Sequence, residues 1–277
     1  MSDDFTLMGV VNVTPDSFSD GGRYLDSEAA IGHALELAEE GAAILDVGGE
    51  STRPGADPVD ADEELRRVLP VIEGVASARP EAKISVDTSK AAVAAAALEA
   101  GGTMVNDVTA LRGDPRMARV VADAGADCCL MHMLGEPRTM QDDPRYGDVV
   151  AEVKEFLEER LAFAVAAGIA EDRVILDPGI GFGKTGAHNL ELLARLRELV
   201  SIGPRVMVGT SRKSFLGRLT GRPVDERLAG TIASCVIAYE RGARVFRLHE
   251  VAAVSDALKV AAATVAPWTT RPTGSTG

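Results

Sequence analysis

The chain has 277 residues, enough for one large domain with its own core or for two small ones. Its 42 acidic residues outnumber the 29 basic ones, and the formal net charge of −13 argues against a nucleic-acid-binding or anionic-membrane surface, since both need basic patches. No segment approaches the roughly 18 consecutive apolar residues of a membrane span, and the acidic N-terminal segment lacks the pattern of a signal peptide. The cysteines Cys128, Cys129 and Cys235 lie in apolar or helix-like segments, so we expect buried thiols and a reducing, cytoplasmic location.

Along the chain, short β-prone apolar runs alternate with Ala-, Leu- and Glu-rich segments of helical periodicity. The predicted strands cover residues 7–12, 43–48, 83–88, 103–108, 127–132, 174–179, 205–211 and 244–250. The predicted helices cover residues 26–41, 62–78, 90–101, 115–125, 149–168, 189–203, 226–242 and 253–265. This alternation indicates βαβ units and a parallel sheet. Eight such units predict an α/β fold of the (β/α)8 TIM-barrel type in a single domain, and a doubly wound open sheet is the alternative.

We expect the barrel domain to span residues 1–268, because no linker or shift in composition marks a second domain. The tail over residues 269–277 has no apolar pattern and is expected to be disordered. Glycines that favour a left-handed helix end directly follow the periodic part of several predicted helices: Gly41, Gly101, Gly125, Gly168 and Gly242.

Polar side chains end every predicted strand, and in a (β/α)8 barrel the carboxyl ends of the strands form the active site. The residues at these ends are Asn12, Asp46, Asp87, Asn106, Asp107, His132, Asp177, Ser211, Arg212, Lys213, Arg247 and His249. The carboxylates and amide of Asp87, Asn106 and Asp177 suit the edge of a planar heterocycle that carries both donors and acceptors. The cationic groups predict an anionic substrate group, with phosphate as the first expectation: Arg53, Lys213, Arg247 and His249.

Three loops are rich in glycine or unusually long. The segment DPGIGFGK places Asp177 at a strand end, and its glycines would let Phe182 and Lys184 turn over that carboxylate. It lacks the spacing of a phosphate-binding P-loop, and it is equally consistent with a plain tight connection. Residues 12–24 and 48–59 are longer than plain connectors, so we expect them to close over a substrate, with flexible decoration as the alternative.

Segments in order along nearly the whole chain resemble the dihydropteroate synthases, a pterin-binding TIM-barrel family of folate biosynthesis that sulfonamides target. The matching segments are GVVNVTPDSFSDGG (9–22), DVGGESTRPGA (46–56), SVDTSK (85–90), VNDV (105–108), LMHMLGEPRTMQ (130–141), DPGIGFGKTGAHN (177–189), GTSRKSFLG (209–217), DERLAGT (225–231) and RLHEV (247–251). The resemblance implies a transferase in which the amine of 4-aminobenzoate displaces pyrophosphate from 6-hydroxymethyl-7,8-dihydropterin diphosphate. The products would be 7,8-dihydropteroate and pyrophosphate.

The resemblance also implies the roles of individual residues. The pterin ligands would be Asp87, Asn106, Met131, Asp177, Gly209 and Lys213. The diphosphate contacts would be Asn12, Thr52, Arg53, Arg247 and His249. The 4-aminobenzoate pocket would contain Phe18, Pro54, Phe182, Lys213 and Ser214. The groups expected to carry catalysis are Asp87, Asp177, Lys213 and Arg53.

The cofactor implied by the resemblance is Mg²⁺, with Asn12 as its protein ligand. The family is dimeric, so a homodimer through the late helices is expected. Glu250 stands where the family usually has Asp, and the resemblance gives no clear role to His132, which could be no more than a satisfied strand-end histidine.

Two other functions remain open from the residues. A methyltransferase that binds methyltetrahydrofolate in a related barrel would leave the cations unused, because its substrate has no diphosphate. A catalytically silent pterin-binding protein usually loses residues of the first two loops, which are intact here. Pyrophosphate release that depends on 4-aminobenzoate would separate these alternatives from a dihydropteroate synthase.

Overall fold

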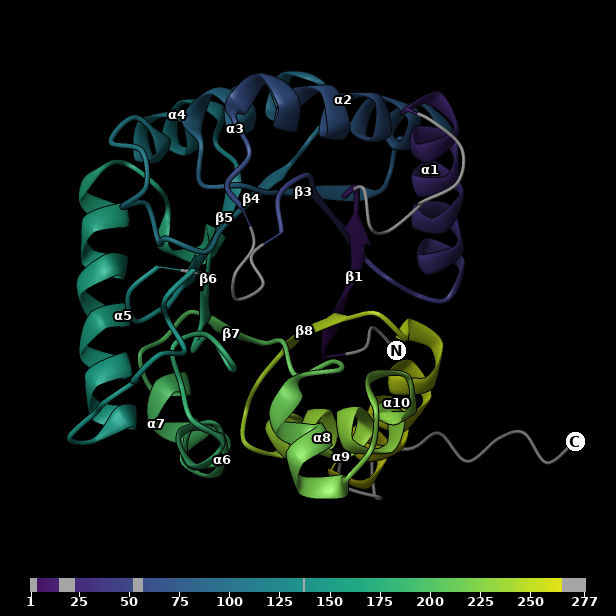
Figure 1. Cartoon of the computed structure of the whole chain (residues 1–277). Coiled ribbons are helices and arrows are strands. Elements are labelled where there is room, and N and C mark those ends of the chain that lie inside the picture. Colours follow the sequence, from purple (N-terminus) through teal and green to yellow (C-terminus); the bar gives the residue numbers. More distant parts are fainter. Residues whose placement is uncertain (1–3, 15–22, 52–56, 137, 266–277) are drawn as a thin grey trace, which may run out of the picture.

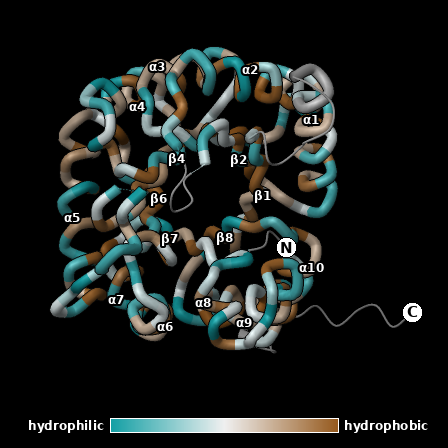
Figure 2. Tube along the Cα trace, viewed as in Figure 1, coloured by the Kyte–Doolittle hydropathy of each residue, from teal (hydrophilic) through white to brown (hydrophobic). Residues whose placement is uncertain are grey.

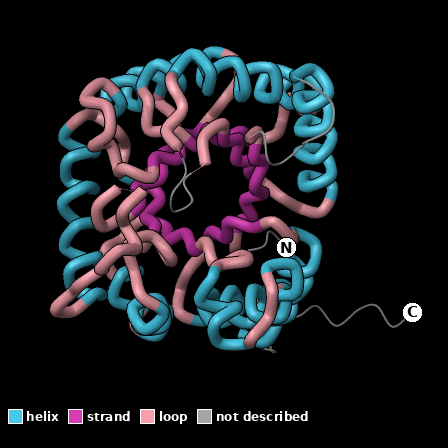
Figure 3. The backbone as a smooth tube through the Cα atoms, viewed as in Figure 1, coloured by secondary structure: helices cyan, strands magenta, loops and turns pink. Residues whose placement is uncertain are grey.

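The computed structural model describes residues 4–14, 23–51, 57–136 and 138–265, and its eight parallel strands close into a barrel in sequence order (Figure 1, Figure 3). The strands are β1 (Thr6–Asn12), β2 (Ile44–Gly48), β3 (Lys83–Asp87), β4 (Met104–Asp107), β5 (Asp127–Met131), β6 (Val174–Asp177), β7 (Arg205–Val208) and β8 (Val245–Leu248). Because β1 pairs with both β2 and β8, the sheet has no edge, and the doubly wound alternative is wrong. The (β/α)8 barrel prediction is confirmed.

Helices surround the ring of strands (Figure 3). They are α1 (Arg23–Glu39), α2 (Ala61–Ala78), α3 (Ala91–Glu99), α4 (Met117–Ala124), α5 (Val149–Ala166), α6 (Gly186–Ala194), α7 (Leu196–Val200), α8 (Ser214–Thr220), α9 (Leu228–Glu240) and α10 (Val251–Val265), with short 3-10 turns η1 (Glu171–Arg173) and η2 (Val224–Glu226). None of the helices in the described ranges combines the length and apolar character needed to cross a bilayer.

The predicted helices match the observed ones except around two segments. The expected single helix over 189–203 is two helices, α6 and α7, separated by Arg195, whose backbone leaves the helical region at φ −106° and ψ 22°. The short helix α8 was not predicted, because its seven residues are too few for a periodic pattern. The five glycines expected after helices all have positive φ, from 58° at Gly125 to 111° at Gly101.

The outward face of the strands is apolar and forms the main core with the helices. Hydrophobic residues recur along the strands (Figure 2), and the core cluster includes outward residues such as Val47, Val86 and Leu176 together with helix residues such as Val68 and Leu192. Each strand is buried on both faces, as expected for a parallel sheet covered by helices. The cysteine thiols are buried, as predicted.

The inward face of the strands has two layers of different chemistry. The lower layer is a separate apolar cluster of Met8, Ile44, Met104, Cys129, Ile175, Met207 and Val245. Side chains two residues apart on a strand point to the same face, so the next inward residues toward the carboxyl ends are polar on four of these strands. These residues are Asp46, Asn106, Asp177 and Arg247. The alternation therefore places a polar layer at the mouth of the barrel on top of an apolar one.

Candidate active site

A network of charged and amide groups joins four strands at the barrel mouth. The Arg247 Nε donates to Asp46 Oδ2 at 2.6 Å, and Arg247 Nη2 donates to Asp87 Oδ2 at 2.8 Å. The Asn106 amide also donates to Asp46 Oδ2, at 3.1 Å. Asp46, which the sequence marked only as a strand-end residue, thus binds two residues of the predicted site, and Arg247 joins the third, Asp87, to them. The inward position of Asp46, two residues after the apolar Ile44, was the signal that could have identified it.

The ion pairs of Arg247 affect the charge of this network. Burial raises the pKa of Asp87 to about 7, although the positive charge of Arg247 acts in the opposite direction. Burial lowers the pKa of Arg247, but the neighbouring Asp46 and Asp87 carboxylates outweigh it and hold that pKa above its usual range. Because these carboxylates already bind the guanidinium, an arriving phosphate would compete with them for Arg247. The contact of Arg247 with a diphosphate remains a prediction.

Asp177 lies at the end of β6 and is 5% exposed. Its Oδ1 accepts the backbone N–H of Gly179 at 2.7 Å, and its backbone carbonyl accepts the N–H of His132 at 3.0 Å. Burial raises the pKa of Asp177, and the Gly179 hydrogen bond and the Lys213 charge oppose that effect. Gly179 has a φ of +65°, and a Cβ there would lie 1.9 Å from the His132 carbonyl oxygen. Position 179 therefore requires glycine, because the backbone of the β6 loop packs directly against the backbone at the end of β5.

Lys213 and Phe182 meet over the Gly-rich loop. The Lys213 ammonium lies 4.1 Å from the centroid of the Phe182 ring, close enough for a cation–π interaction. Burial and the Arg247 charge lower the pKa of Lys213 to about 8. Ser214 is the first residue of helix α8, and its hydroxyl accepts a hydrogen bond from Arg218 at 3.1 Å.

His249 is held by the neighbouring β7 loop. Its Nδ1 lies 2.9 Å from the Ser211 hydroxyl, which also accepts the backbone N–H of His249 at 3.2 Å. Glu250 lies 3.2 Å from the same hydroxyl and forms an ion pair with Arg212. The longer side chain at position 250 thus connects the β8 loop to the β7 loop.

Asn12 is the last residue of β1 and is partly buried. The described residues contain no group of three or more His, Cys, Asp or Glu side chains arranged to hold a metal ion. Mg²⁺ commonly uses one or two protein oxygens together with water and substrate phosphates, so a single carboxamide fits an ion that arrives with a diphosphate. The described side chains do not form a magnesium site whose ligands all come from the protein.

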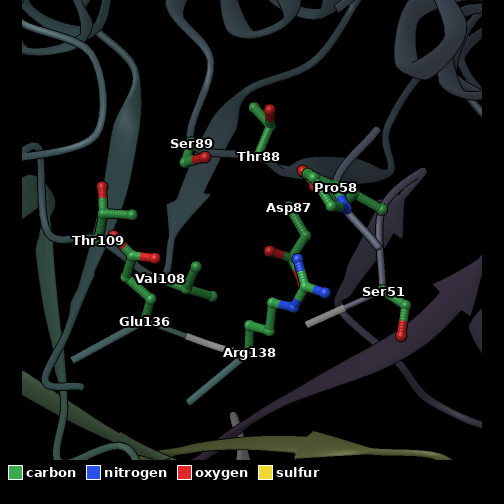
Figure 4. A pocket seen from close by; sticks show the side chains of 10 residues that line it. Ser51, Pro58, Asp87, Thr88, Ser89, Val108, Thr109, Glu136 and Arg138 are labelled. Atoms are coloured by element: carbon green, nitrogen blue, oxygen red, sulfur yellow. The ribbon is translucent and has the colours of Figure 1, made fainter. Parts of the chain in front are cut away.

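A pocket of about 300 Å³ opens beside Asp87 (Figure 4). Loops after β2, β3, β4 and β5 line it, and its residues are Glu50, Ser51, Pro58, Asp87, Thr88, Ser89, Val108, Thr109, Glu136 and Arg138. Among the predicted site residues that the structure describes, only Asp87 lines the pocket. Val108 connects it to the predicted pterin contact Met131, since both belong to an apolar cluster with Met133 and Met140 against which Phe182 packs. No site role was predicted for the wall formed by the β3, β4 and β5 loops, although Thr88, Ser89, Val108, Glu136 and Arg138 lie in segments that resemble the family.

The remaining predicted residues lie after β7, in the two long loops or in the β6 loop. Gly209 follows β7 on the inward register, two residues after Met207. Phe18, Thr52, Arg53 and Pro54 lie outside the described residues, as do large parts of the two long loops. The sequence analysis expected Lys184 to turn over the Asp177 carboxylate together with Phe182, and in the structure the Lys184 Nζ lies 2.9 Å from His132 Nδ1.

Comparisons with known proteins agree with this geometry. The sequence model of the family described as "Pterin binding enzyme" matches residues 8–249. The dihydropteroate synthase of Escherichia coli K12 is 47% identical over 259 residues, which cover 94% of this chain and 91% of that protein. A Xanthomonas albilineans dihydropteroate synthase structure with 4-aminobenzoic acid is 51% identical, with a TM-score of 0.89 and coverage of 95% of this chain and 93% of that one.

Two further structures carry other ligands. The Xanthomonas albilineans enzyme in complex with 7,8-dihydropteroate is 48% identical, with a TM-score of 0.85 and coverage of 95% and 94% of the two chains. A Yersinia pestis dihydropteroate synthase in a sulfonamide drug complex is 44% identical, with a TM-score of 0.88 and coverage of 94% of both chains. The family match spans most of the chain, and the identities extend over nearly all of it. The chain therefore belongs to the pterin-binding enzyme family, among the dihydropteroate synthases.

Proposed function

We propose that this chain condenses 6-hydroxymethyl-7,8-dihydropterin diphosphate with 4-aminobenzoate to give 7,8-dihydropteroate and pyrophosphate, as a transferase of tetrahydrofolate biosynthesis. One observation carries the proposal: inward carboxylate and amide groups share a barrel mouth with Lys213 and Arg247, in a chain about half identical to dihydropteroate synthases. Related enzymes have been crystallised with 4-aminobenzoic acid and with 7,8-dihydropteroate, which supports the same substrates here.

The pterin half of the site consists of Asp87, Asn106 and Asp177. A carboxylate accepts N–H groups of a pterin edge, and a carboxamide both donates and accepts. The site is buried, so a ring without matching groups would leave these side chains unpaired and bind poorly. Met131 packs against the ring, and Gly209 leaves space for it.

The diphosphate half combines Arg247 and His249 with Asn12, and with Thr52 and Arg53 from the second loop. Ser211 keeps the His249 ring oriented, because its hydroxyl lies on Nδ1 and leaves Nε2 for an anion. Mg²⁺, when bound through Asn12 and the substrate phosphates, supplies further positive charge that neutralises the leaving group.

The 4-aminobenzoate half is formed by Phe182, Lys213 and Ser214, with Phe18 and Pro54 from the long loops. The Phe182 ring offers a flat apolar surface for the benzene ring. The Lys213 ammonium and the Ser214 hydroxyl are suited to the carboxylate end. A sulfonamide occupies a related enzyme, and we propose that sulfonamides compete with 4-aminobenzoate here as well.

The residues act mainly through electrostatics. Loss of pyrophosphate leaves positive charge on the methylene carbon, which the electron-rich dihydropterin shares. Asp87 and Asp177 stabilise that charge, while Arg247 and His249 stabilise the departing anion. The amine of 4-aminobenzoate is neutral and already nucleophilic, so the site needs no strong general base.

The test is release of pyrophosphate from the purified chain with both substrates and Mg²⁺. We expect release to require 4-aminobenzoate and to stop when EDTA removes Mg²⁺ and resume when Mg²⁺ is restored. A pterin-binding protein without this activity would bind a pterin in calorimetry but release no pyrophosphate. That outcome would overturn the proposal.

We also propose that the chain is a cytoplasmic homodimer. Exposed apolar residues on neighbouring helices support a self-interface, namely Ile237 on α9 at 40% exposure and Val260 on α10 at 66%. Multi-angle light scattering at micromolar concentration tests the dimer, and a monomer mass would contradict it. The domain limit at residue 268 and the disordered tail after it remain proposals, because they lie outside the described residues.

A further inference from the structure

One of the large, fully buried side chains in the described part of the protein is a lysine. Lys184 is 1% exposed and lies in the loop between β6 and α6. Removing an ammonium group from water is costly unless protein groups replace the lost hydrogen bonds. Burial lowers the pKa of Lys184 to about 7, although the nearby Asp177 carboxylate acts in the opposite direction. A methionine of similar length would avoid this cost, so the charge of Lys184 calls for a physical reason.

The Lys184 ammonium has a partner for each of its three N–H groups. Its Nζ lies 2.9 Å from His132 Nδ1, 2.9 Å from the Phe182 carbonyl oxygen and 3.3 Å from the His132 carbonyl oxygen. Ammonium groups have three donors and no acceptor, so the set is complete. The three acceptors come from two loops that are separated by about 50 residues in sequence, since the His132 contact spans 52 positions.

His132 acts as an acceptor in this arrangement. Its ring stands edge-on to Phe156 at 4.9 Å between centroids and 84° between planes. Burial and the Lys184 charge lower the pKa of His132 to about 3, so the ring is neutral at physiological pH. When Lys184 is protonated, its ammonium donates to Nδ1, and the proton of the neutral ring then resides on Nε2. This gives His132 a role that its sequence position did not reveal.

The same two loops are joined at other points. Gln141 donates to the Gly181 carbonyl at 2.6 Å, and Tyr146 donates to the Gly183 carbonyl at 2.8 Å. A Cβ at Gly183 would lie 2.7 Å from the backbone oxygen of Leu134. The backbones therefore touch without intervening side chains, and hydrogen bonds fix their relative position.

We propose that Lys184 and His132 are positioning residues that fix Phe182 for the 4-aminobenzoate half of the site. Lys184 binds the carbonyl of Phe182 itself, and the Phe182 ring lies 4.1 Å from the Lys213 ammonium. Neither residue touches a reacting atom. Two of the three pterin groups depend less on this contact, because Asp87 and Asn106 belong to the network of Asp46 and Arg247 on other strands. Asp177 keeps its hydrogen bond from the His132 backbone N–H when the Lys184 side chain is changed. The inference rests on the proposed function, since it assigns Phe182 to 4-aminobenzoate.

The test compares Lys184→Met with the control Lys83→Met, which removes a 57%-exposed ammonium at the opposite end of the barrel. We expect Lys184→Met to raise the KM for 4-aminobenzoate by roughly ten-fold or more, as loss of charged hydrogen bonds predicts. The KM for the pterin diphosphate should change less than about three-fold. Lys83→Met should match the wild type. An unchanged KM for 4-aminobenzoate, or an equal rise in both KM values, would overturn the proposal.

A second pair of variants keeps the test valid if Lys184→Met does not fold. His132→Leu removes the acceptor, whereas the smaller His132→Asn keeps an oxygen near the position of Nδ1. We expect the leucine variant to raise the KM for 4-aminobenzoate several-fold and the asparagine variant to restore it. Equal values for the two variants would overturn the proposal. If the wild type itself releases no pyrophosphate, the proposed function fails; if it turns over normally and these variants do not alter KM, only the positioning role fails.

Discussion

The ion pairs of Arg247 lead to a prediction about stability. Arg247→Met keeps most of the apolar stem but removes the guanidinium that binds Asp46 and Asp87. Asp46 is 0% exposed, and its Oδ1 already has no hydrogen-bond partner among the described residues. The variant would leave two buried carboxylates with one amide donor, that of Asn106.

Breaking a buried ion pair by removing one partner costs about 3–5 kcal/mol, whereas an exposed pair contributes about 0–1 kcal/mol. Arg119→Met is the matched control, because Arg119 pairs with Asp123 at 3.2 Å while their side chains are 85% and 70% exposed. We expect Arg247→Met to lower the free energy of unfolding by several kcal/mol and Arg119→Met by less than about 0.5 kcal/mol.

The loss of stability in the Arg247→Met variant should also depend on pH. The pKa of Asp87 is raised from 3.8 to about 7 even with Arg247 present, and removal of Arg247 would raise it further. The folded state then holds its proton more tightly than the unfolded state, so stability falls as pH rises from about 4 through 7. Each pH unit in this window lowers the free energy of unfolding by up to about 1.4 kcal/mol.

Urea unfolding followed by circular dichroism at about pH 5 and about pH 8 measures both effects. Adding Asp46→Asn to Arg247→Met should recover at least about 1 kcal/mol, because one unpaired charge disappears. The reasoning would be refuted if Arg247→Met were no less stable than Arg119→Met at pH 8, or if it became more stable as pH rose.

The remaining predictions concern turnover. Asp177→Asn should abolish pyrophosphate release without unfolding the chain, because an amide oxygen can still accept the Gly179 N–H while the negative charge is lost. Lys213→Ala should also abolish pyrophosphate release, since it removes the ammonium from the Phe182 ring. A native thermal unfolding transition is the control for both variants. Wild-type turnover in either variant would exclude that residue from the mechanism. The pH profile of kcat/KM should be bell-shaped, because Asp87 gains a proton below its pKa of about 7 and Lys213 loses its charge above its pKa of about 8. A flat profile from about pH 5 to about pH 10 would contradict those assignments.

Much of the fold follows from the sequence because the strands are short apolar runs that end in polar residues. The ends of β1 and β2 were predicted correctly, whereas the other six strand ends were predicted too late, as for residues 205–211, since the observed β7 stops at Val208. The break between α6 and α7 at Arg195 could not be predicted, because no glycine or proline marks it. The periodicity of apolar residues predicts that a strand or helix exists, but it does not predict the residue at which that element ends.

The inward carboxylates of the site could be predicted because their strands all end at one edge. The pairing of Arg247 with Asp46 and Asp87 could not, since it depends on register across the closed sheet. The burial of Lys184 could not be predicted either, because the sequence places this lysine over Asp177 but does not show that the loop after β5 covers it. Lys184 is buried because the backbones of the loops after β5 and β6 contact each other around it.

The apolar layer beneath the mouth sets how deep a ligand can reach. Methionine, isoleucine, cysteine and valine side chains fill the centre of the barrel below Asp46, so a flat ring bound at the mouth as proposed would rest on sulfur and methyl groups instead of water. An inhibitor extended downward from that ring would meet a closed hydrophobic floor. Added affinity for this protein must therefore come from groups that grow sideways or outward, toward the pocket beside Asp87.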